Sequence, residues 1–459
     1  MIFKTFEQYQ DYLGRLLKAQ SRVEGVKLTE GQTKTVTFQL TDGCNLCCTY
    51  CYQINKGKRV MDFEVAKKFF DLLIEDSYKD DTYVSLRTTP ALVIEFIGGE
   101  PLLEIDLLDQ ITDYIRCKLI QENHPWANKI IFSMISNGVL YFDPRVQNYL
   151  TKNHGYVSFG ISLDGCKDLH DMCRVFPDGL GSYDMAEAGC IHYMANYETK
   201  MLTKMTMAPE NITWTYEAFK NLYELGYRTI HANCVYEKGW EIKHAVILYD
   251  QLKKIADFLI ENSLEQEVVF TMFTQDDCKP MNPGDNQNYC GSTGCMLACD
   301  PDGQICPCIR FMKSSLGDEL GDFTLGNIKD GIGHTEEHKN NITILDSITR
   351  RSQSTDECWD CPIARGCGWC TALNYQELGT PDARCTYICW MHRARSLGNV
   401  YFWNKVYQKY NEPDVFEMFL QDEHALQILS KEEHDMLLEL VAENKARKEE
   451  YELQNKDAE

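Results

Sequence analysis

Short apolar runs alternate with longer amphipathic stretches along the first half of the chain. Six runs have the length and the β-branched and aromatic content of buried strands, at residues 35–40, 91–97, 129–136, 156–163, 203–208 and 229–236. The stretches between them place apolar residues at helical spacing, as in residues 63–76 and 105–120. Because parallel strands are joined by right-handed crossovers, this alternation predicts an α/β fold built from six βα units.

The pattern changes after residue 265, where loop-like sequence replaces the alternation. Of the 21 cysteines, 11 lie between Cys290 and Cys389. We expect this region to be organised by metal, and the residues after 400 to be helical and highly charged. The sequence therefore predicts four parts: an N-terminal helical segment at 1–30, a βα domain at 31–265, a cysteine-rich domain at 266–400 and a charged helical tail at 401–459.

Charge and hydropathy narrow the range of partners. The formal net charge of -23 argues against a nucleic acid or an anionic membrane as a partner, because both would be repelled. The first 20 residues mix charged with apolar side chains, and no later apolar run approaches the ~18 residues of a membrane span. We therefore expect a cytoplasmic protein. Because disulfides do not persist in a reducing cytosol, the cysteines point to iron-sulfur or zinc chemistry.

Four short motifs follow the first four expected strands. They are the cysteine-rich stretch 42–52, Gly-Gly-Glu-Pro at 98–101, Ser-Asn-Gly at 136–138 and Asp-Gly at 164–165. In a parallel barrel, the loops after the carboxyl ends of the strands share one rim. The four motifs are therefore expected to converge on a single active site.

The first cysteine group has three spaced thiols. Cys44, Cys48 and Cys51 form a CxxxCxxC pattern. Three thiolates hold three irons of a four-iron cluster and leave the fourth iron open, whereas a ferredoxin cluster or a structural zinc site takes four ligands. The pattern therefore indicates a cluster whose open iron binds another molecule, with Cys47 as an incidental thiol.

With Gly-Gly-Glu-Pro after the second strand, this pattern resembles the radical S-adenosylmethionine (SAM) superfamily. The resemblance implies a partial (β/α)6 barrel, a 4Fe-4S cluster that chelates SAM at its open iron, and an electron donor such as flavodoxin or ferredoxin. It also implies reductive cleavage of SAM to a 5'-deoxyadenosyl radical, the cofactor supplying the difficult chemistry and the protein the positioning.

The resemblance also implies a set of SAM contacts. The matching positions are Tyr50, Gly98, Gly99, Glu100, Asn137, Ser162 and Arg174. Tyr50 corresponds to the aromatic residue beside the adenine, and the Gly-Gly-Glu motif to the groups that face the methionine amino group. Asn137 and Ser162 stand where ribose and carboxylate contacts lie, and Arg174 matches an arginine that pairs with the SAM carboxylate. A turn, packing, capping or a surface salt bridge stays open as the alternative for these positions.

The downstream cysteines resemble the SPASM domain. The matching residues are Cys290, Gly303, Cys308, Cys358, Cys361, Cys367, Cys370 and Cys389. The one departure is that two residues rather than three separate Cys367 from Cys370. The resemblance implies two auxiliary 4Fe-4S clusters, the first held by Cys358, Cys361, Cys367 and Cys389 and the second by Cys290, Cys308 and Cys370.

Three alternatives stay open for these cysteines. Cys295 closes the second auxiliary cluster, or it stands off and leaves an iron for a substrate thiolate. Cys385 is an alternative to Cys389 as the last ligand. The whole region is also compatible with a pair of zinc sites, since CxxC pairs serve zinc equally well.

Longer stretches, such as 94–111 and 160–184, resemble SPASM maturases of ribosomally made peptides, especially those whose precursors carry repeated Cys-x-x-x units. This implies hydrogen abstraction from a precursor peptide and formation of a cross-link, most often a cysteine thioether. The alternatives are a sulfatase-maturating enzyme that makes formylglycine and, in another class, an iron-sulfur electron carrier. With 43 residues before Cys44, a leader-recognition domain is not expected there. The N-terminal segment and the tail at 413–459 are the candidate leader sites, and a solvated helical extension without a binding role stays open as the alternative.

Overall fold

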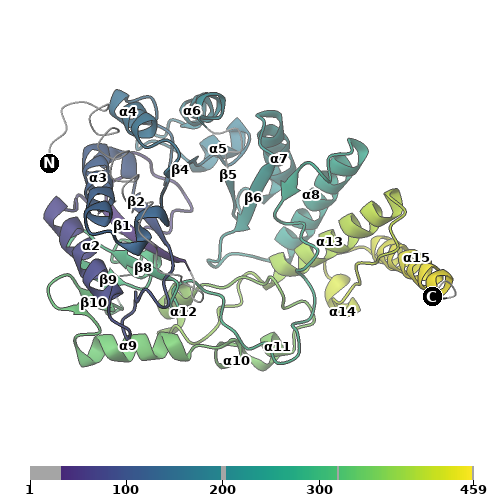
Figure 1. Ribbon diagram of the computed structural model, residues 1–459. Helices are drawn as coiled ribbons and strands as arrows, with labels where there is room; N and C mark the ends of the chain where they lie inside the picture. Colours follow the sequence, from purple (N-terminus) through teal and green to yellow (C-terminus); the bar gives the residue numbers. More distant parts are fainter. Residues whose placement is uncertain (1–32, 198–202, 318–319, 457–459) are drawn as a thin grey trace.

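The computed structural model describes residues 33–197, 203–317 and 320–456 (Figure 1). The helical segment expected at 1–30 lies outside the described residues. The strands are β1 (Lys34–Thr41), β2 (Leu92–Gly98), β3 (Ile130–Ser136), β4 (Val157–Ile161), β5 (Thr203–Met207), β6 (Thr229–Cys234), β7 (Val269–Phe270), β8 (Met296–Cys299), β9 (Gln304–Cys306), β10 (Gly326–Asn327) and β11 (Gly331–Ile332). The six expected strands therefore correspond to β1 to β6.

Helices follow most of these strands. The α-helices are α2 (Phe63–Ser77), α3 (Ile105–Gln121), α4 (Pro144–Lys152), α5 (Lys167–Cys173), α6 (Tyr183–Asn196), α7 (Thr215–Glu224), α8 (Ile242–Glu261), α9 (Glu336–Ser347), α10 (Arg350–Gln353), α11 (Asp356–Trp359), α12 (Thr371–Leu378), α13 (Cys389–Lys409), α14 (Asp422–Ala425) and α15 (Lys431–Lys456). Short 3-10 helices are η1 (Pro101–Glu104), η2 (Pro125–Asn128), η3 (Ile212–Trp214) and η4 (Ile309–Phe311). The helices expected at 63–76 and 105–120 are α2 and α3.

The strands of the described residues form two sheets. One has the order β11-β10-β9-β8-β1-β2-β3-β4, and the other β5-β6-β7. Strands β1 to β4 pair in parallel, as do β5 and β6, which is the arrangement that the βα alternation predicts. No ladder joins β4 to β5, and the nearby link is a hydrogen bond of 3.1 Å from Thr203 Oγ1 to the carbonyl of Leu163. Figure 1 shows the second sheet standing apart from β4.

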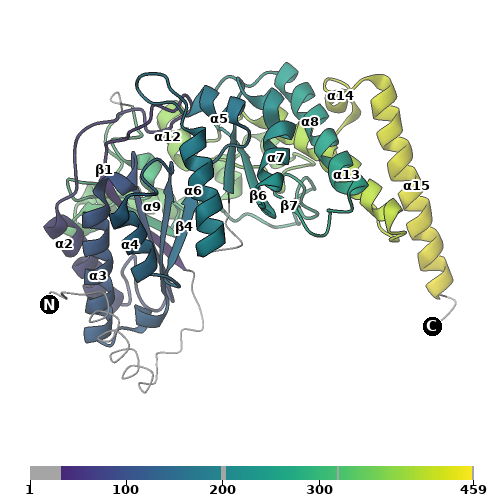
Figure 2. The ribbon, with the colours of Figure 1, turned by 90° about the horizontal axis from the view of Figure 1, so that it is seen from above.

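Amphipathic helices cover the outer faces of both sheets (Figures 1 and 2). In α2 the buried residues follow helical spacing, and Phe69 packs edge-on against Phe38 of β1 with ring centroids 5.1 Å apart. Asp62 caps this helix, because its carboxylate accepts a hydrogen bond from the amide of Glu64 at 2.7 Å. The inner faces of the strands remain to line the functional site.

The cysteine-rich region continues the first sheet. Strand β8 pairs in parallel with β1, with Thr35 opposite Met296 and Phe38 opposite Cys299, and β9 to β11 follow as antiparallel strands. The sheet therefore runs across the expected boundary at 265. The division into four parts stays a prediction.

The C-terminal helices pack on the second sheet's side of the molecule. Figures 1 and 2 show α13 beside α8 and α15 extending at the far edge. Glu433 of α15 accepts hydrogen bonds from Tyr249 Oη at 2.6 Å and from Lys253 Nζ at 2.7 Å, and Asn444 donates to the carbonyl of Asn404 at 3.0 Å. The charged tail is thus anchored to α8 and α13.

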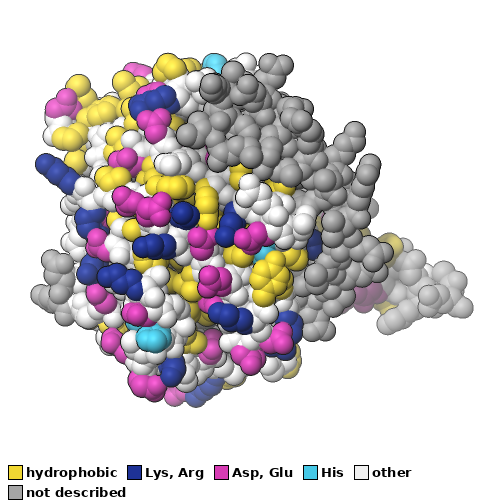
Figure 3. Space-filling view, turned by 60° about the vertical axis from the view of Figure 1, so that its left-hand side comes forward, with side chains coloured by type: hydrophobic (Ala, Val, Ile, Leu, Met, Phe, Trp, Pro, Cys, Tyr) yellow, Lys and Arg dark blue, Asp and Glu magenta, His cyan; other side chains and the backbone are white. Residues whose placement is uncertain are grey.

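Acidic and basic side chains are interspersed over the described part of the face shown in Figure 3. Among the helices of the described residues, none is long and apolar enough to cross a membrane.

Candidate active site and cysteine groups

One cavity of about 410 Å³ lies at the carboxyl ends of the parallel strands; we call it the first-cluster cavity. Every residue expected for the first cluster and for SAM lines it: Cys44, Cys48, Tyr50, Cys51, Gly98, Gly99, Glu100, Asn137, Ser162 and Arg174. Most of these residues lie at or directly after the ends of β1 to β4, whereas Arg174 follows α5. The structure thus brings together all the residues that the sequence assigns to this site.

The two glycines after β2 allow the cysteine loop to approach the strand end. A Cβ atom on Gly99 would lie 2.3 Å from the carbonyl oxygen of Gly43 and 2.8 Å from Cys44 Cβ, and one on Gly98 would lie 2.8 Å from the carbonyl oxygen of Thr41. Backbone hydrogen bonds from Gly99 to Thr41 (3.0 Å) and from Glu100 to Gly43 (2.9 Å) hold the loops at this distance. Only residues without a side chain fit here.

Glu100 joins the loops after β2 and β3. Its carboxylate is almost completely buried and accepts hydrogen bonds from the amides of Leu102 (3.0 Å) and Asn137 (2.8 Å) and from Ser136 Oγ (2.8 Å). Burial raises the pKa of Glu100, while these donors act in the opposite direction. Asn137 in turn donates to Asn45 Oδ1 at 2.6 Å, which connects it to the cysteine loop.

The sequence analysis missed Asp164 as a site residue. This fully buried carboxylate accepts a hydrogen bond from Arg174 Nε at 2.8 Å and another from the hydroxyl of Tyr50. The guanidinium of Arg174 also lies 5.4 Å from the centre of the Tyr50 ring. Asp164 therefore orients two of the residues expected to contact SAM. Its position in the Asp-Gly motif after the fourth strand was the available signal.

The thiols of Cys44, Cys48 and Cys51 are close enough to influence one another's pKa values. Burial raises the pKa of Cys48 to about 11, and Cys51 and Cys44 contribute in the same direction. Burial likewise raises the pKa of Cys44, and Cys51 is among its neighbours. Cys47, by contrast, is exposed and does not line the cavity.

A second cysteine group surrounds another cavity, of about 390 Å³. Cys358, Cys361, Cys367 and Cys389 line it, as does Cys385. Burial raises the pKa of Cys389 to about 12, with contributions from Cys367 and Cys358, whereas the neighbours of the Cys385 thiol are Glu377, Lys238 and Cys370. Cys389 is thus the better placed of the two alternatives to join this group.

The third group comprises Cys290, Cys308 and Cys370. Burial raises the pKa of the Cys308 thiol, and Cys370 and Cys290 are the next contributors. Cys290 Sγ lies 3.4 Å from the hydroxyl oxygen of Thr371, the residue that directly follows Cys370 in the chain. The side chain of Tyr83 has both Cys295 and Cys308 among its electrostatic neighbours. Whether Cys295 is a ligand stays a prediction.

The donor chemistry of these groups fits iron-sulfur clusters. All 21 cysteines are free of disulfides, and the three groups present sulfur donors at two cavities and around the buried Cys308. Thiolates are the donors that such clusters take. Within the described ranges, no three His, Cys, Asp or Glu side chains are arranged to hold one metal ion.

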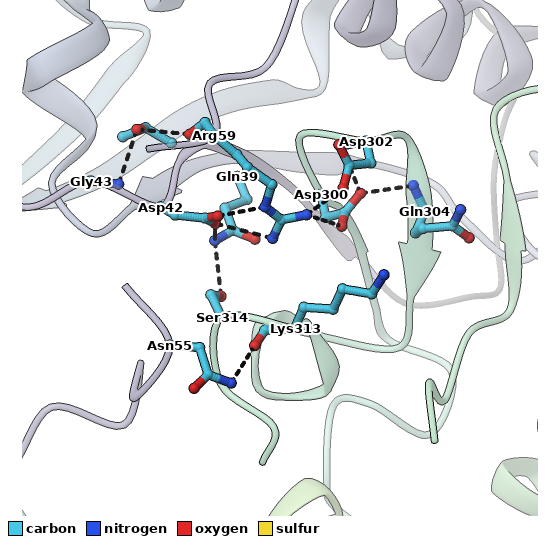
Figure 4. Close-up of polar contacts among 11 residues, drawn as sticks. Gln39, Asp42, Gly43, Asn55, Arg59, Asp300, Asp302, Gln304, Lys313 and Ser314 are labelled. Atoms are coloured by element: carbon cyan, nitrogen blue, oxygen red, sulfur yellow. Dashed lines mark hydrogen bonds and ion pairs between the residues drawn. The ribbon is translucent and has the colours of Figure 1, made fainter. Parts of the chain in front are cut away.

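A polar network fixes the cysteine loop against the cysteine-rich region (Figure 4). Arg59 pairs with Asp42, next to the loop, at 2.6 Å, and with Asp300 at 3.3 Å and Asp302 at 2.5 Å beyond β8. Ser314 accepts a hydrogen bond from Gln39 at 2.9 Å. The network therefore holds the segment containing Cys44 in register with the segment containing Cys308.

Comparison with known proteins agrees with this geometry. A family described as a 4Fe-4S single cluster domain matches residues 29–157. The cysteine-type anaerobic sulfatase-maturating enzyme of Clostridium perfringens is 24% identical over 304 residues, which are 63% of this chain and 76% of that protein. The subtilosin biosynthesis protein AlbA of Bacillus subtilis is 23% identical over 299 residues, 64% of this chain and 56% of that protein.

The fold is also similar to those of solved structures. A structure of anSMEcpe with bound AdoMet (SAM) and the Kp18Cys peptide matches with a TM-score of 0.58 and 19% identity, over 82% of this chain and 99% of that one. The sequence relatives, the 4Fe-4S match and the fold together indicate a protein similar to radical SAM enzymes. Streptococcus suis SuiB bound to its precursor peptide SuiA matches this chain with a TM-score of 0.52 and 13% identity, over 82% of this chain and 78% of that one. These similarities indicate a 4Fe-4S cluster and SAM as cofactors, and the cysteines of this chain are compatible with auxiliary clusters.

Proposed function

We propose that this radical SAM enzyme modifies a ribosomally made precursor peptide and joins a carbon of one residue to a cysteine sulfur as a thioether. The observation that carries the proposal is the closeness of the first-cluster cavity to the third cysteine group. Arg310 lines that cavity. Burial lowers the pKa of Arg310, and the nearby Cys370 thiol makes the largest contribution in the opposite direction. A peptide held in the cavity is therefore within reach of both cysteine groups.

Tyr52 and Arg310 both line the first-cluster cavity and lie close to the third cysteine group. The Arg310 guanidinium lies 5.1 Å from the centre of the Tyr52 ring and pairs with Glu237. Tyr52 has both Cys51 and Cys308 among its electrostatic neighbours. One partly buried aromatic side chain is thus a neighbour of both the first and the third cysteine groups.

The residues of this chain have separate roles in the proposed reaction. Cys44, Cys48 and Cys51 would hold the first cluster, and Gly98 and Gly99 keep the backbone close to it. When bound, SAM and the first cluster supply the radical that removes a hydrogen atom, and the auxiliary clusters supply an acceptor for the electron released as the sulfur–carbon bond forms.

Arg174, already oriented by Asp164 and Tyr50, offers a planar guanidinium toward the carboxylate of SAM. Burial in the cavity strengthens this interaction, because charges attract more strongly away from water. The ligand assignments of the cysteines, the electron donor and the site of leader binding are parts of this proposal as well.

The sulfatase-maturating reaction is the second candidate, supported by the relative from Clostridium perfringens and by the shared fold. Mass spectrometry of a co-expressed precursor peptide distinguishes the two. A thioether retains sulfur and loses two hydrogen atoms, whereas formylglycine formation from cysteine removes the sulfur. A peptide that loses sulfur would contradict the thioether proposal.

A further inference from the structure

A second cavity, of about 800 Å³, lies deeper between the two sheets; we call it the inner passage. It is lined by residues of β3 to β6 and shares Ile135, Lys204 and Asn233 with the first-cluster cavity. The two cavities therefore meet at these side chains.

The inner passage is open where a barrel of this size is usually filled by side chains. Ile131 and Ile135 of β3 line it and are 40% and 51% exposed. The residues opposite Ser133 and Ile135 on β4 are Ser158 and Gly160, which are small. Apolar side chains exposed in a concave site are typical of a surface that binds a ligand.

The charge of the passage is opposite to that of the chain. The chain has 69 acidic residues, yet among the described residues that line the passage none is Asp or Glu. Lys204 is a cation there, accompanied by His154 and His231. The passage therefore favours a neutral or anionic ligand.

Lys204 is the basic group available to such a ligand. Its ammonium has no hydrogen bond or ion pair among the described residues. The charges of Arg174 and Arg310 lower its pKa, and that of Glu95 raises it. Glu95 accepts a hydrogen bond from Thr37 Oγ1 at 2.7 Å, while Asp164 pairs with Arg174 and Glu237 with Arg310. The Lys204 side chain is exposed to the passage, and desolvation by the surrounding protein lowers its pKa.

The position of Lys204 sets where the ligand charge would lie. Thr206 is two residues closer to the carboxyl end of β5, points to the same side of the strand and lines the first-cluster cavity. Two strand residues span about 7 Å. A group bound by Lys204 is therefore one or two peptide residues away from a residue held in the first-cluster cavity.

We propose that the inner passage binds the substrate peptide in an extended form, and that Lys204 recognises a carboxylate carried by a residue next to the modified one. This inference rests on the proposed peptide substrate. It identifies the substrate as a peptide with an acidic side chain near the reacting residue.

The test uses the reconstituted enzyme with SAM and two isosteric probes, N-acetyl-Cys-Asp-amide and N-acetyl-Cys-Asn-amide. Binding is measured by saturation-transfer NMR with competition. We expect the Asp probe to bind about tenfold more tightly than the Asn probe, the range of a charge-assisted hydrogen bond. In Lys204→Met this preference is lost, in Lys204→Arg it is retained, and in the control Lys220→Met, a surface lysine, it is unchanged.

Equal binding of the two probes, no binding of either, or a preference that survives Lys204→Met would overturn the inference. Binding is read without turnover, so the result is separate from that for the proposed reaction. An Asp preference that depends on Lys204 stands even where no thioether is found on a precursor peptide.

Discussion

At the scale of single residues, the site depends on a buried ion pair that the sequence alone did not identify. The side chain of Asp164 is fully buried and that of Arg174 nearly so. Removing one partner of such a pair leaves an uncompensated charge, which costs more than the pair itself contributes. Asp164 is thus expected to matter for stability as well as for SAM binding.

Asp164→Asn keeps the shape of the side chain and removes its charge. We expect the free energy of unfolding to fall by roughly 3 kcal/mol, because Arg174 loses its buried partner, and the Kd for SAM to rise at least about tenfold. Denaturant unfolding and calorimetric SAM titration measure the two effects. The control is Asp168→Asn, at an exposed position of α5; equal behaviour of the two variants would contradict the role of Asp164.

His124 makes stability depend on pH. It is buried, its ring lies 2.8 Å from Ser77 Oγ and accepts from the amide of Trp126 at 3.2 Å, and burial lowers its pKa to about 4. The unfolded chain takes up a proton at about pH 6.5 and the folded chain only near pH 4, so stability falls as the pH is lowered through this window.

The effect of this histidine is roughly 2 kcal/mol at about pH 5. We expect His124→Asn, which keeps an acceptor at the start of η2, to show a correspondingly weaker loss of stability between about pH 7 and pH 5. Urea unfolding at the two pH values checks this. An unchanged pH dependence in the variant would contradict the lowered pKa of His124 in the folded protein.

At the scale of elements, the strand ends and the cysteine loop are matched to each other. The loop after β1 lies against the end of β2, and this contact exists only because Gly98 and Gly99 lack side chains. In the Gly-Gly-Glu motif, the two glycines therefore matter for the close approach of the loops, as the Glu100 carboxylate does for its hydrogen bonds.

Gly99→Ala is expected to displace the cysteine loop, because the added methyl group would lie 2.3 Å from the Gly43 carbonyl oxygen. We predict a folded protein that cleaves SAM at least about a hundredfold more slowly, a barrier change of roughly 3 kcal/mol. Assays of 5'-deoxyadenosine with dithionite, alongside circular dichroism, measure this. Gly321→Ala, where nothing lies within 4 Å, is the control and should retain activity.

Much of the fold was predictable from local pattern. The apolar runs of β1 to β6 and the helical spacing of α2 and α3 act over a few residues, and their positions are confirmed. The separation of β4 from β5 and the addition of β8 beside β1 depend on contacts between distant segments. Asp164 was missed because a carboxylate after a strand reads as a turn residue until its partners are known.

At the scale of the whole molecule, the Arg59 network connects the barrel to the cysteine-rich region (Figure 4). Asp42 and Asp300 are nearly buried, with side chains 4% and 2% exposed. Both depend on Arg59 for charge compensation. The network thus determines how the first and third cysteine groups face each other.

Arg59→Met removes this compensation. We expect the free energy of unfolding to fall by roughly 1–3 kcal/mol, since two buried carboxylates lose a partner. The exposed pair Arg145 with Asp106 offers the control, and Arg145→Met should change stability by less than about 0.5 kcal/mol. If guanidinium unfolding gives the same midpoint for both variants, the network has no stabilising role.

The measurement that tests the central claim most directly is the iron content after anaerobic reconstitution, together with 5'-deoxyadenosine production, in the wild type and in the Cys44, Cys48 and Cys51 triple alanine variant. With three four-iron clusters, about twelve irons per chain fall to about eight in the variant, and SAM cleavage is abolished. An unchanged iron content, or SAM cleavage that survives in the variant, would contradict the assignment of the radical chemistry to the first cysteine group.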